Sequence, residues 1–254
     1  MRWISARVVT GTLLTGSQTT LYPSIESSPI ASRISLAVYS SPMTASLWDL
    51  PLATFRDRTA SAAPTPGGGS VCAVSATLGL GLVVMALEIT RRKCSPELAA
   101  SIDTTLETAR TALAALSAAA DEDARVFETY MVAHRLPRQT DVEVQARTEA
   151  LRLASHAAAR VPLAAARQAV QVMAVAERAA DLCSAHVVSD VLAGAELLHA
   201  STVGLLVTLT MNLRADDASP ELFDYRTQHD DLSSLATHAI AAVRGRVQER
   251  LDEP

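Results

Sequence analysis

The residues best suited to chemistry begin with a glycine-rich turn, in which positions 64–70 read Pro-Thr-Pro-Gly-Gly-Gly-Ser. The two prolines favour an extended approach, and the three glycines permit backbone conformations that other residues avoid. A small and apolar stretch follows, so we expect the turn to open a helix whose first N–H groups have no partner within the helix. Such a terminus attracts carboxylates, phosphates and electron-rich heterocycles. No Gly-Lys-Ser/Thr follows and no strand precedes, which argues against a P-loop, and a tight helix entry without a ligand is the alternative interpretation.

Asp123 is the second candidate. On a helix, Asp123 shares one stripe with Phe127, Tyr130 and His134, and this stripe is otherwise of the kind that faces inward. Asp121 instead lies four residues before Arg125, as expected of a solvated ion pair. An inward carboxylate is costly unless it is paired or functional. Asp123 is therefore predicted to be either an acid/base group or one half of a salt bridge inside the bundle.

His186 and Asp190 form the third candidate. They are four residues apart, so their side chains can form a hydrogen bond on a helix. Their stripe continues through small residues, which either let another helix approach closely or leave a groove. An imidazole and a carboxylate at the edge of a groove could perform general acid/base chemistry. A helix–helix contact with a satisfied carboxylate is the structural alternative.

The elements that must position these residues are predicted to be helices throughout. Alanine, the best helix former, is by far the most common residue, and glycine occurs only 10 times. Ser-Pro-Glu, a typical helix start, occurs at Ser95 and Ser219, and a Thr-x-x-Glu capping box begins at Thr140. No alternating strand pattern occurs. We expect an all-α, single-domain bundle of six to seven long helices, which cover about 51–60, 71–89, 95–133, 140–160, 162–182, 184–213 and 219–251. Leu52 and Phe55 are expected to face inward, and Pro162 to kink or restart its helix.

Residues 1–45 lack this periodicity and are rich in Ser and Thr. We interpret 1–45 as a disordered or non-native extension, with Met43 as a possible initiator, and 46–254 as the helical domain.

Residues 71–89 approach the length of a membrane span. Many of them are small and no aromatic belt flanks them, so we expect a buried core helix and no membrane association. The apolar excess of 71–89 and 197–213 predicts a homodimer or a higher homo-oligomer.

Composition narrows the functional classes. The net charge is −5 and aromatic residues make up 4%, which argues against a nucleic-acid partner. The 3 cysteines are far apart and show no metal-ligand spacing, as expected of a reduced, cytoplasmic protein without a metal. His and acidic residues do not recur at bundle metal-site spacing either.

An ordered set of motifs resembles one known family. The Pro-Gly-Gly-Gly-Ser turn is similar to the start of the cyclodeaminase domain of formiminotransferase-cyclodeaminase, which also occurs alone as a methenyltetrahydrofolate cyclohydrolase. Further similarities follow in order over about positions 47–250: Asp121-Glu122-Asp123-Ala124, Arg135-Leu136-Pro137-Arg138, Val161-Pro162-Leu163, Ser189-Asp190 and Asn212-Leu213.

The resemblance implies a dimeric helical enzyme that binds a reduced folate as substrate. Its chemistry is at the one-carbon unit between N5 and N10, either by hydrolysis of a methenyl bridge or by cyclisation of a formimino group with loss of ammonia, with no metal or redox cofactor. Carried onto this sequence, the resemblance implies catalytic roles for Asp123 and Asp190, the latter tuned by His186. The substrate-binding candidates are Gly67, Gly68, Gly69, Ser70, Ser189 and Asn212, with Arg92 or Lys93 meeting the glutamate tail.

This sequence also departs from the family pattern. The family usually has Gly-Asn shortly before Ser-Asp, where this chain has Cys183-Ser184, and Val188 stands where a basic residue can precede Ser-Asp. The 254 residues include no formiminotransferase segment, which favours hydrolysis over deamination. Two alternatives stay open: another addition, elimination or cyclisation on the same scaffold, and a non-catalytic helical oligomer.

Overall fold

The computed structural model describes residues 45–213 and 220–252. These residues form six α-helices and two short 3-10 helices and contain no strand, which confirms the all-α prediction. The expected extension at 1–45 lies almost entirely outside the described residues. The elements in chain order are η1 (Leu47–Asp49), α2 (Leu52–Thr59), α3 (Gly68–Arg91), α4 (Pro96–His134), α5 (Asp141–Leu182), η2 (Ala185–Val187), α6 (Val188–Leu213) and α7 (Pro220–Asp252).

The helix starts follow the predicted capping residues. Ser95 caps α4 by accepting a hydrogen bond from the Leu98 N–H, and proline occupies the first turn. Thr140 and Glu143 form the complete capping box of α5. Local sequence therefore determines where the two longest helices begin.

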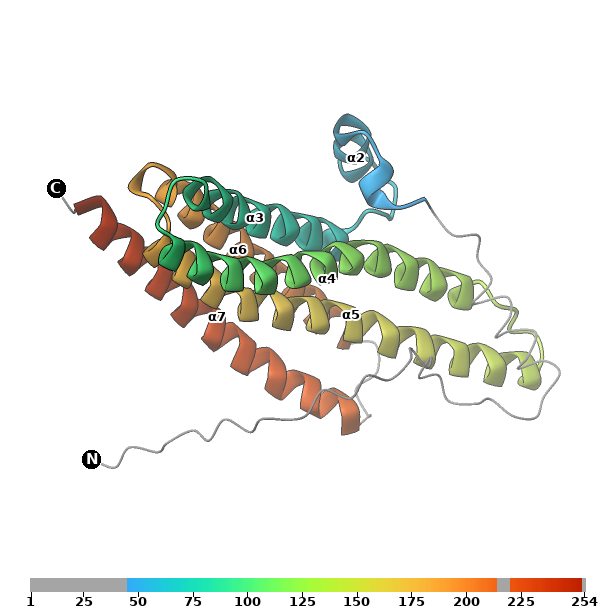
Figure 1. The fold of residues 1–254 in the computed structure, drawn as a ribbon. Coiled ribbons are helices and arrows are strands. Elements are labelled where there is room, and N and C mark those ends of the chain that lie inside the picture. Colours follow the sequence, from blue (N-terminus) through green and yellow to red (C-terminus); the bar gives the residue numbers. More distant parts are fainter. Residues whose placement is uncertain (1–44, 214–219, 253–254) are drawn as a thin grey trace, which may run out of the picture.

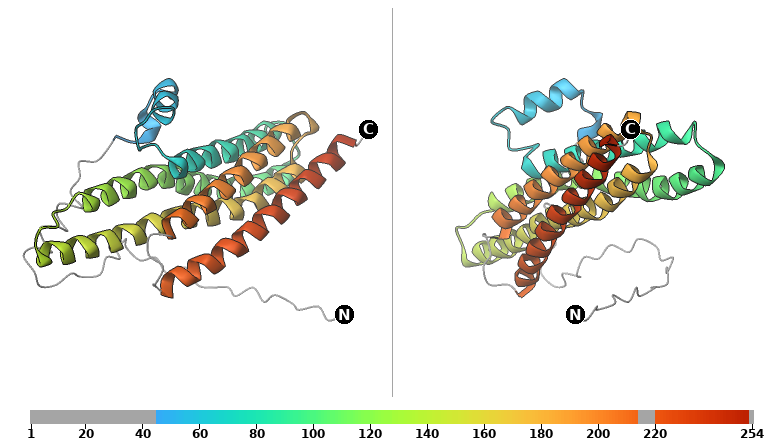
Figure 2. Two further views of the ribbon diagram at one scale, coloured as in Figure 1. Left: turned by 180° about the vertical axis from the view of Figure 1, so that it is seen from behind. Right: turned by 90° about the vertical axis from the view of Figure 1, so that its left-hand side faces the viewer.

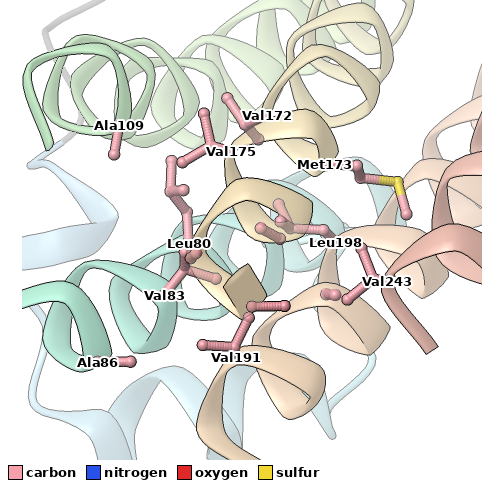
Figure 3. Packing of buried hydrophobic residues seen from close by; sticks show 14 of the residues in the cluster. Leu80, Val83, Ala86, Ala109, Val172, Met173, Val175, Val191, Leu198 and Val243 are labelled. Carbon is pink, nitrogen blue, oxygen red and sulfur yellow. The ribbon is translucent and has the colours of Figure 1, made fainter. Parts of the chain in front are cut away.

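Five long helices pack side by side into the bundle, and α2 stands apart from it (Figures 1 and 2). α3 and α6 run antiparallel, since residues near the start of α3 contact residues near the end of α6. The main core takes apolar side chains from α3, α4, α5, α6 and α7 (Figure 3). Its largest fully buried members include Leu80, Leu106, Met173 and Leu198. Burying one such side chain contributes about 1.5–3 kcal/mol.

Two glycines let α3 and α6 touch backbone to backbone. A Cβ atom added at Gly194 would lie 2.4 Å from the carbonyl oxygen of Gly79, and one added at Gly79 would lie 2.7 Å from the carbonyl oxygen of Gly194. Real side chains do not tolerate such separations from backbone atoms. At Gly194, the small-residue stripe predicted on α6 therefore allows α6 to approach α3 closely.

Pro162 does not restart a helix, contrary to expectation, because α5 continues through it. Proline has no N–H, so the Ala158 carbonyl four residues earlier loses its helical donor. The side-chain amide of Asn212 on α6 donates to that carbonyl at 2.7 Å. Asn212 thus replaces the missing backbone bond and joins the end of α6 to the middle of α5.

The short helix α2 contradicts the expectation that Leu52 faces inward. Leu52 is 78% exposed, Phe55 is only partly buried, and α2 has no buried residue. An eight-residue helix that stands away from the bundle has no core to face.

Apolar side chains are also exposed along α3 and α6, on Leu78, Met85, Ile89, Leu197, Val203, Val207 and Met211. The segments Gly68–Arg91 and Ala185–Leu213 are long and apolar enough to cross a membrane by length and composition alone. Their most apolar windows have mean hydropathies of 2.2 and 1.5, and 50% and 44% of these windows are buried inside the protein. Each helix therefore has one face in the core and one apolar face that the described residues leave exposed.

The link between Pro162 and Asn212 predicts a coupled pair of substitutions. Asn212→Ala leaves the Ala158 carbonyl without a donor and should lower the free energy of unfolding by about 1–3 kcal/mol. The same change in a Pro162→Ala background should cost much less, because the alanine N–H then reaches Ala158. Chemical denaturation of the two single variants and the double variant measures this coupling. Equal costs in both backgrounds would contradict the proposed replacement of the backbone bond.

Candidate active site

The glycine-rich turn and Asp123 meet at the N-terminus of α3. The Ser70 hydroxyl donates to Oδ2 of Asp123 at 2.7 Å. Ser70 is fully buried, and Asp123 is partly buried. A Cβ atom added at Gly69 would lie 2.2 Å from Oδ1 of the same carboxylate. The first two candidates from the sequence are therefore parts of one site.

The glycines serve this site by their lack of side chains. No described glycine has a positive φ, and Gly67, at the N-cap, has φ −94°. The turn therefore does not use the additional backbone conformations that glycine permits. Gly69 is required because the Asp123 carboxylate occupies the space that a Cβ atom would fill.

Burial controls the protonation of Asp123. It raises the pKa of this carboxyl above the ordinary aspartate value, and hydrogen bonds from the side chain and backbone of Ser70 oppose the rise only in part. A raised pKa makes a carboxylate a stronger base than an ordinary aspartate, and this suits a group that accepts and returns a proton. The N-terminus of α3 thus faces an anion of the protein itself.

The end of α6 forms another wall of this site. A Cβ atom at Gly204 would lie 2.4 Å from Sγ of Cys72, and Oγ1 of Thr208 lies 3.8 Å from the Cβ position of Gly68. The pKa of the Cys72 thiol is raised, mainly by burial and also by the nearby charge of Asp123. Cys72 therefore fills space beside Asp123 as a neutral thiol. Sequence reasoning missed Cys72, although it predicted the stripe of small residues on this helix to which Gly204 and Thr208 belong.

A pocket of about 270 Å³ adjoins the site. Its wall includes Pro66, one residue before the glycines, and Ala124, one residue after Asp123. Along α4 the lining continues through Phe127 and Met131 to Arg135.

The segment before α2 closes this pocket from the other side. Asp121 accepts hydrogen bonds from the Ser46 hydroxyl and the Leu47 N–H, each at 2.7 Å. The indole N–H of Trp48 donates to the Ser117 carbonyl at 2.9 Å. The sequence predicted a pair between Asp121 and Arg125, and the structure shows an ion pair of Arg125 with Glu122. Asp121 instead anchors residues 46–48 on α4, beside the pocket.

Three further predicted site residues, Asp190, His186 and Ser189, lie at the opposite end of the bundle, whereas Asn212 lies four residues after Thr208 near the end of α6. Asp190 precedes Thr208 by 18 residues on one helix, which corresponds to about 27 Å at 1.5 Å per residue. His186 and Ser189 are exposed beside it. In a single chain the structure therefore does not bring Asp190 and Asp123 together.

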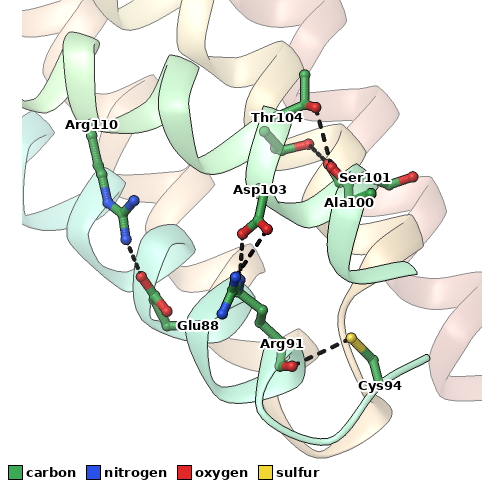
Figure 4. A network of polar contacts seen from close by, with 9 residues as sticks. Glu88, Arg91, Cys94, Ala100, Ser101, Asp103, Thr104 and Arg110 are labelled. Atoms are coloured by element: carbon green, nitrogen blue, oxygen red, sulfur yellow. Dashed lines mark hydrogen bonds and ion pairs between the residues drawn. The ribbon is translucent and has the colours of Figure 1, made fainter. Parts of the chain in front are cut away.

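The cations expected to meet a glutamate tail also lie at the opposite end. Arg92 caps the C-terminus of α3 and Lys93 follows it, about 36 Å along the helix from Gly68. Figure 4 shows this region, where Arg91 pairs with Asp103 and Arg110 with Glu88 between α3 and α4. Within a single chain, Arg92 and Lys93 cannot reach a substrate held at Asp123.

Side-chain composition limits what else the described residues could bind. Among residues 45–213 and 220–252, no group of three or more His, Cys, Asp or Glu side chains is placed to hold a metal ion. The site built around Asp123 offers a carboxyl, a hydroxyl and a helix N-terminus, which suit proton transfer and the binding of a polar organic molecule.

Comparison with known proteins gives consistent matches. The sequence profile of the family described as formiminotransferase-cyclodeaminase matches residues 51–220. A methenyltetrahydrofolate cyclohydrolase from Methylorubrum extorquens is 36% identical over 148 residues, which are 58% of this chain and 70% of that protein. The formimidoyltransferase-cyclodeaminase of Rattus norvegicus is 30% identical over 209 residues, 81% of this chain but only 38% of that longer protein.

A solved structure also matches. The crystal structure of formiminotetrahydrofolate cyclodeaminase from Thermotoga maritima superposes with a TM-score of 0.65 at 26% sequence identity, covering 81% of this chain and 98% of that chain. The profile match spans the site from α2 to the start of α7, including the glycine-rich turn and Asp123. The chain belongs to the formiminotransferase-cyclodeaminase family.

Proposed function

We propose that this protein is a folate-dependent one-carbon enzyme that hydrolyses the methenyl bridge of 5,10-methenyltetrahydrofolate. The observation that carries the proposal is the contact between Ser70 and Asp123 at the glycine-rich start of α3. Family membership and the cyclohydrolase relative support the substrate class. Family membership and the enzyme relatives also favour this function over the alternative of a non-catalytic oligomer.

The chemistry needs a group that moves protons in both directions. The methenyl carbon is electrophilic because it lies between two nitrogens that share a positive charge. Asp123 as carboxylate takes a proton from water while the oxygen bonds to this carbon. The protonated Asp123 then gives its proton to N5 as the carbon–N5 bond breaks, and the hydroxyl proton of the intermediate is released. The products are the N10-formyl compound and one proton in solution.

Ser70 and Gly69 position Asp123 for this role. The hydroxyl of Ser70 holds Oδ2, so the orientation of the carboxyl is fixed before the substrate binds. Gly69 allows the carboxyl to lie directly against the helix backbone. A carboxyl that is already held in one orientation catalyses the reaction better than a freely rotating one, because less entropy is lost on reaching the transition state.

Cyclodeamination is the second candidate, favoured by the similarity to the Thermotoga maritima enzyme. N10 would attack the formimino carbon and pass its proton to the imine nitrogen, and the protonated Asp123 would supply the second proton with which this nitrogen leaves as ammonia. The same carboxyl serves both reactions, so a comparison of the two substrates decides between them.

We also propose a homodimer formed by the exposed apolar side chains of α3 and α6. These form one stripe on each of two adjacent helices, and association would remove them from water. The sequence-based roles of Asp190 and His186 stay predictions. They require such a dimer, because only a partner copy could place these residues near Asp123.

The central functional prediction concerns Asp123→Asn. Wild-type protein should accelerate the loss of the methenyltetrahydrofolate absorbance, and Asp123→Asn should slow this by about a hundredfold or more, since it removes the acid/base group. Asp190→Asn provides the comparison: an equal loss would support a partner's Asp190 at the site, and an unchanged rate would remove it from the mechanism. A wild type without turnover on either substrate would contradict the proposed function.

The pH dependence has a definite sign. A base with a raised pKa is ionised only above that pKa, so the wild-type rate should rise with pH through a value above 3.8, the ordinary aspartate pKa. The stability contributed by this group is full below pH 3.8 and is lost as the pH rises through the folded-state pKa. Asp123→Asn cannot ionise and should therefore be at least as stable as wild type at neutral pH. Thermal unfolding at several pH values checks this, and a large loss of stability at neutral pH would contradict it.

If the dimer forms through the apolar stripe, glutamate substitutions at two exposed valines should affect the oligomeric mass differently. Val207 on α6 is 58% exposed within the apolar stripe, and Val144 on α5 is 46% exposed outside it. Light scattering at micromolar concentration should give a dimeric mass for wild type and Val144→Glu and a monomeric mass for Val207→Glu. A monomeric wild type, or recovery only in a membrane fraction, would show that this face has another role.

A further inference from the structure

The side chains that line the pocket beside Asp123 change from apolar to cationic along α4. Along α4 it begins at Ala124, continues with Phe127 and Met131, and ends at Arg135. Arg58 on α2 adds a second guanidinium to its lining. Along α4 the lining therefore runs from the residue next to Asp123, past apolar side chains, to Arg135, and Arg58 adds a second cation to the same pocket.

The two guanidinium groups are available to a ligand. Both arginines are exposed. Within the described part of the chain, no carboxylate pairs with either of them. By contrast, arginines elsewhere on the bundle pair with carboxylates, as Arg91 does with Asp103 and Arg244 with Glu196.

The acidic groups of the pocket must also be considered. Asp121 lines the pocket, but it accepts hydrogen bonds from Ser46 and Leu47. Glu128 lies on α4, one residue after Phe127 and nearly two turns before Arg135. A ligand with an anionic end at the arginines therefore has its charge separated from Glu128 by about 10 Å along the helix.

From this order we infer that the pocket binds the p-aminobenzoylglutamate half of the substrate, with Arg58 and Arg135 holding its glutamate carboxylates. The inference rests on the proposed function. Asp123 and Arg135 are 12 residues apart on α4, or about 18 Å. A benzoyl ring and one glutamyl residue extend about 10 Å beyond N10, and the arginine side chain covers the rest. The flat ring would lie between Phe127, Met131 and Pro66.

This assignment replaces Arg92 and Lys93 as the cations for the tail. Arg58 and Arg135 line the pocket beside Asp123, whereas within one chain Arg92 and Lys93 lie at the opposite end of α3. Charged hydrogen bonds of this kind contribute about tenfold or more in affinity.

The test compares two substrates and three variants. One substrate is 5,10-methenyltetrahydrofolate, and the other is its analogue with a neutral amide in place of the glutamyl residue. Arg135→Gln and Arg58→Gln should each raise KM about tenfold for the first substrate, leave kcat within twofold, and leave the kinetics of the neutral analogue unchanged. Arg138→Gln makes the same charge change three residues beyond Arg135 and outside the pocket, and it should leave both substrates unaffected.

A binding measurement separates this inference from the proposed function. Calorimetry with N-(p-aminobenzoyl)glutamate should show binding to wild type and to Arg138→Gln and at least tenfold weaker binding to Arg135→Gln, whether or not the protein turns over a substrate. Equal binding by all of them would overturn the inference even if the enzyme is active. An equal loss for both substrates in Glu128→Gln, with none in Arg135→Gln, would also overturn it, because the pocket would then bind the pterin end.

Discussion

Asp123 must lie directly against the backbone of another helix, and this close approach constrains much of the structure. The carboxyl occupies the space beside Gly69 that any side chain at that position would take, and it accepts the Ser70 hydroxyl bond. Partial burial there raises its pKa, which suits a group that must accept and return a proton. A helix N-terminus beside it limits the cost of its negative charge.

A line of small residues between α3 and α6 helps to fix the position of α3, and with it the close approach of Asp123 to the α3 backbone. Gly79 and Gly194 touch backbone to backbone, and Gly204 leaves room for Cys72 beside Asp123. Farther along α6, Asn212 supplies the hydrogen bond that Pro162 removes from α5. The end of α6 is thereby tied to α5 at the same end of the bundle as the reactive carboxyl.

Much of this could be predicted from the sequence, because capping and composition act locally. Ser95 and Thr140 start helices as expected, and the glycine-rich turn and Asp123 were both singled out. What could not be predicted was their contact, because 53 residues separate Ser70 from Asp123 and only the packing of α3 on α4 joins them. The same limit explains why Asp190, Arg92 and Lys93 were predicted at a site that they do not reach within one chain. The spacing of residues along one helix does not say which end of the bundle they occupy. The continuous α5 was missed because the donor that compensates for Pro162 comes from α6.

The most direct test of this account removes no functional group. Gly69→Ala adds one methyl group where the Asp123 carboxyl lies, and Gly245→Ala adds one to α7 where, apart from neighbouring residues of the same helix, no described atom lies within 4 Å of it. We expect Gly69→Ala to fold but to lose turnover of 5,10-methenyltetrahydrofolate by about a hundredfold, as expected for the loss of a general acid/base group, while Gly245→Ala keeps the wild-type rate. A folded Gly69→Ala protein with full activity would contradict the claim that the position of Asp123 against α3 carries the reaction.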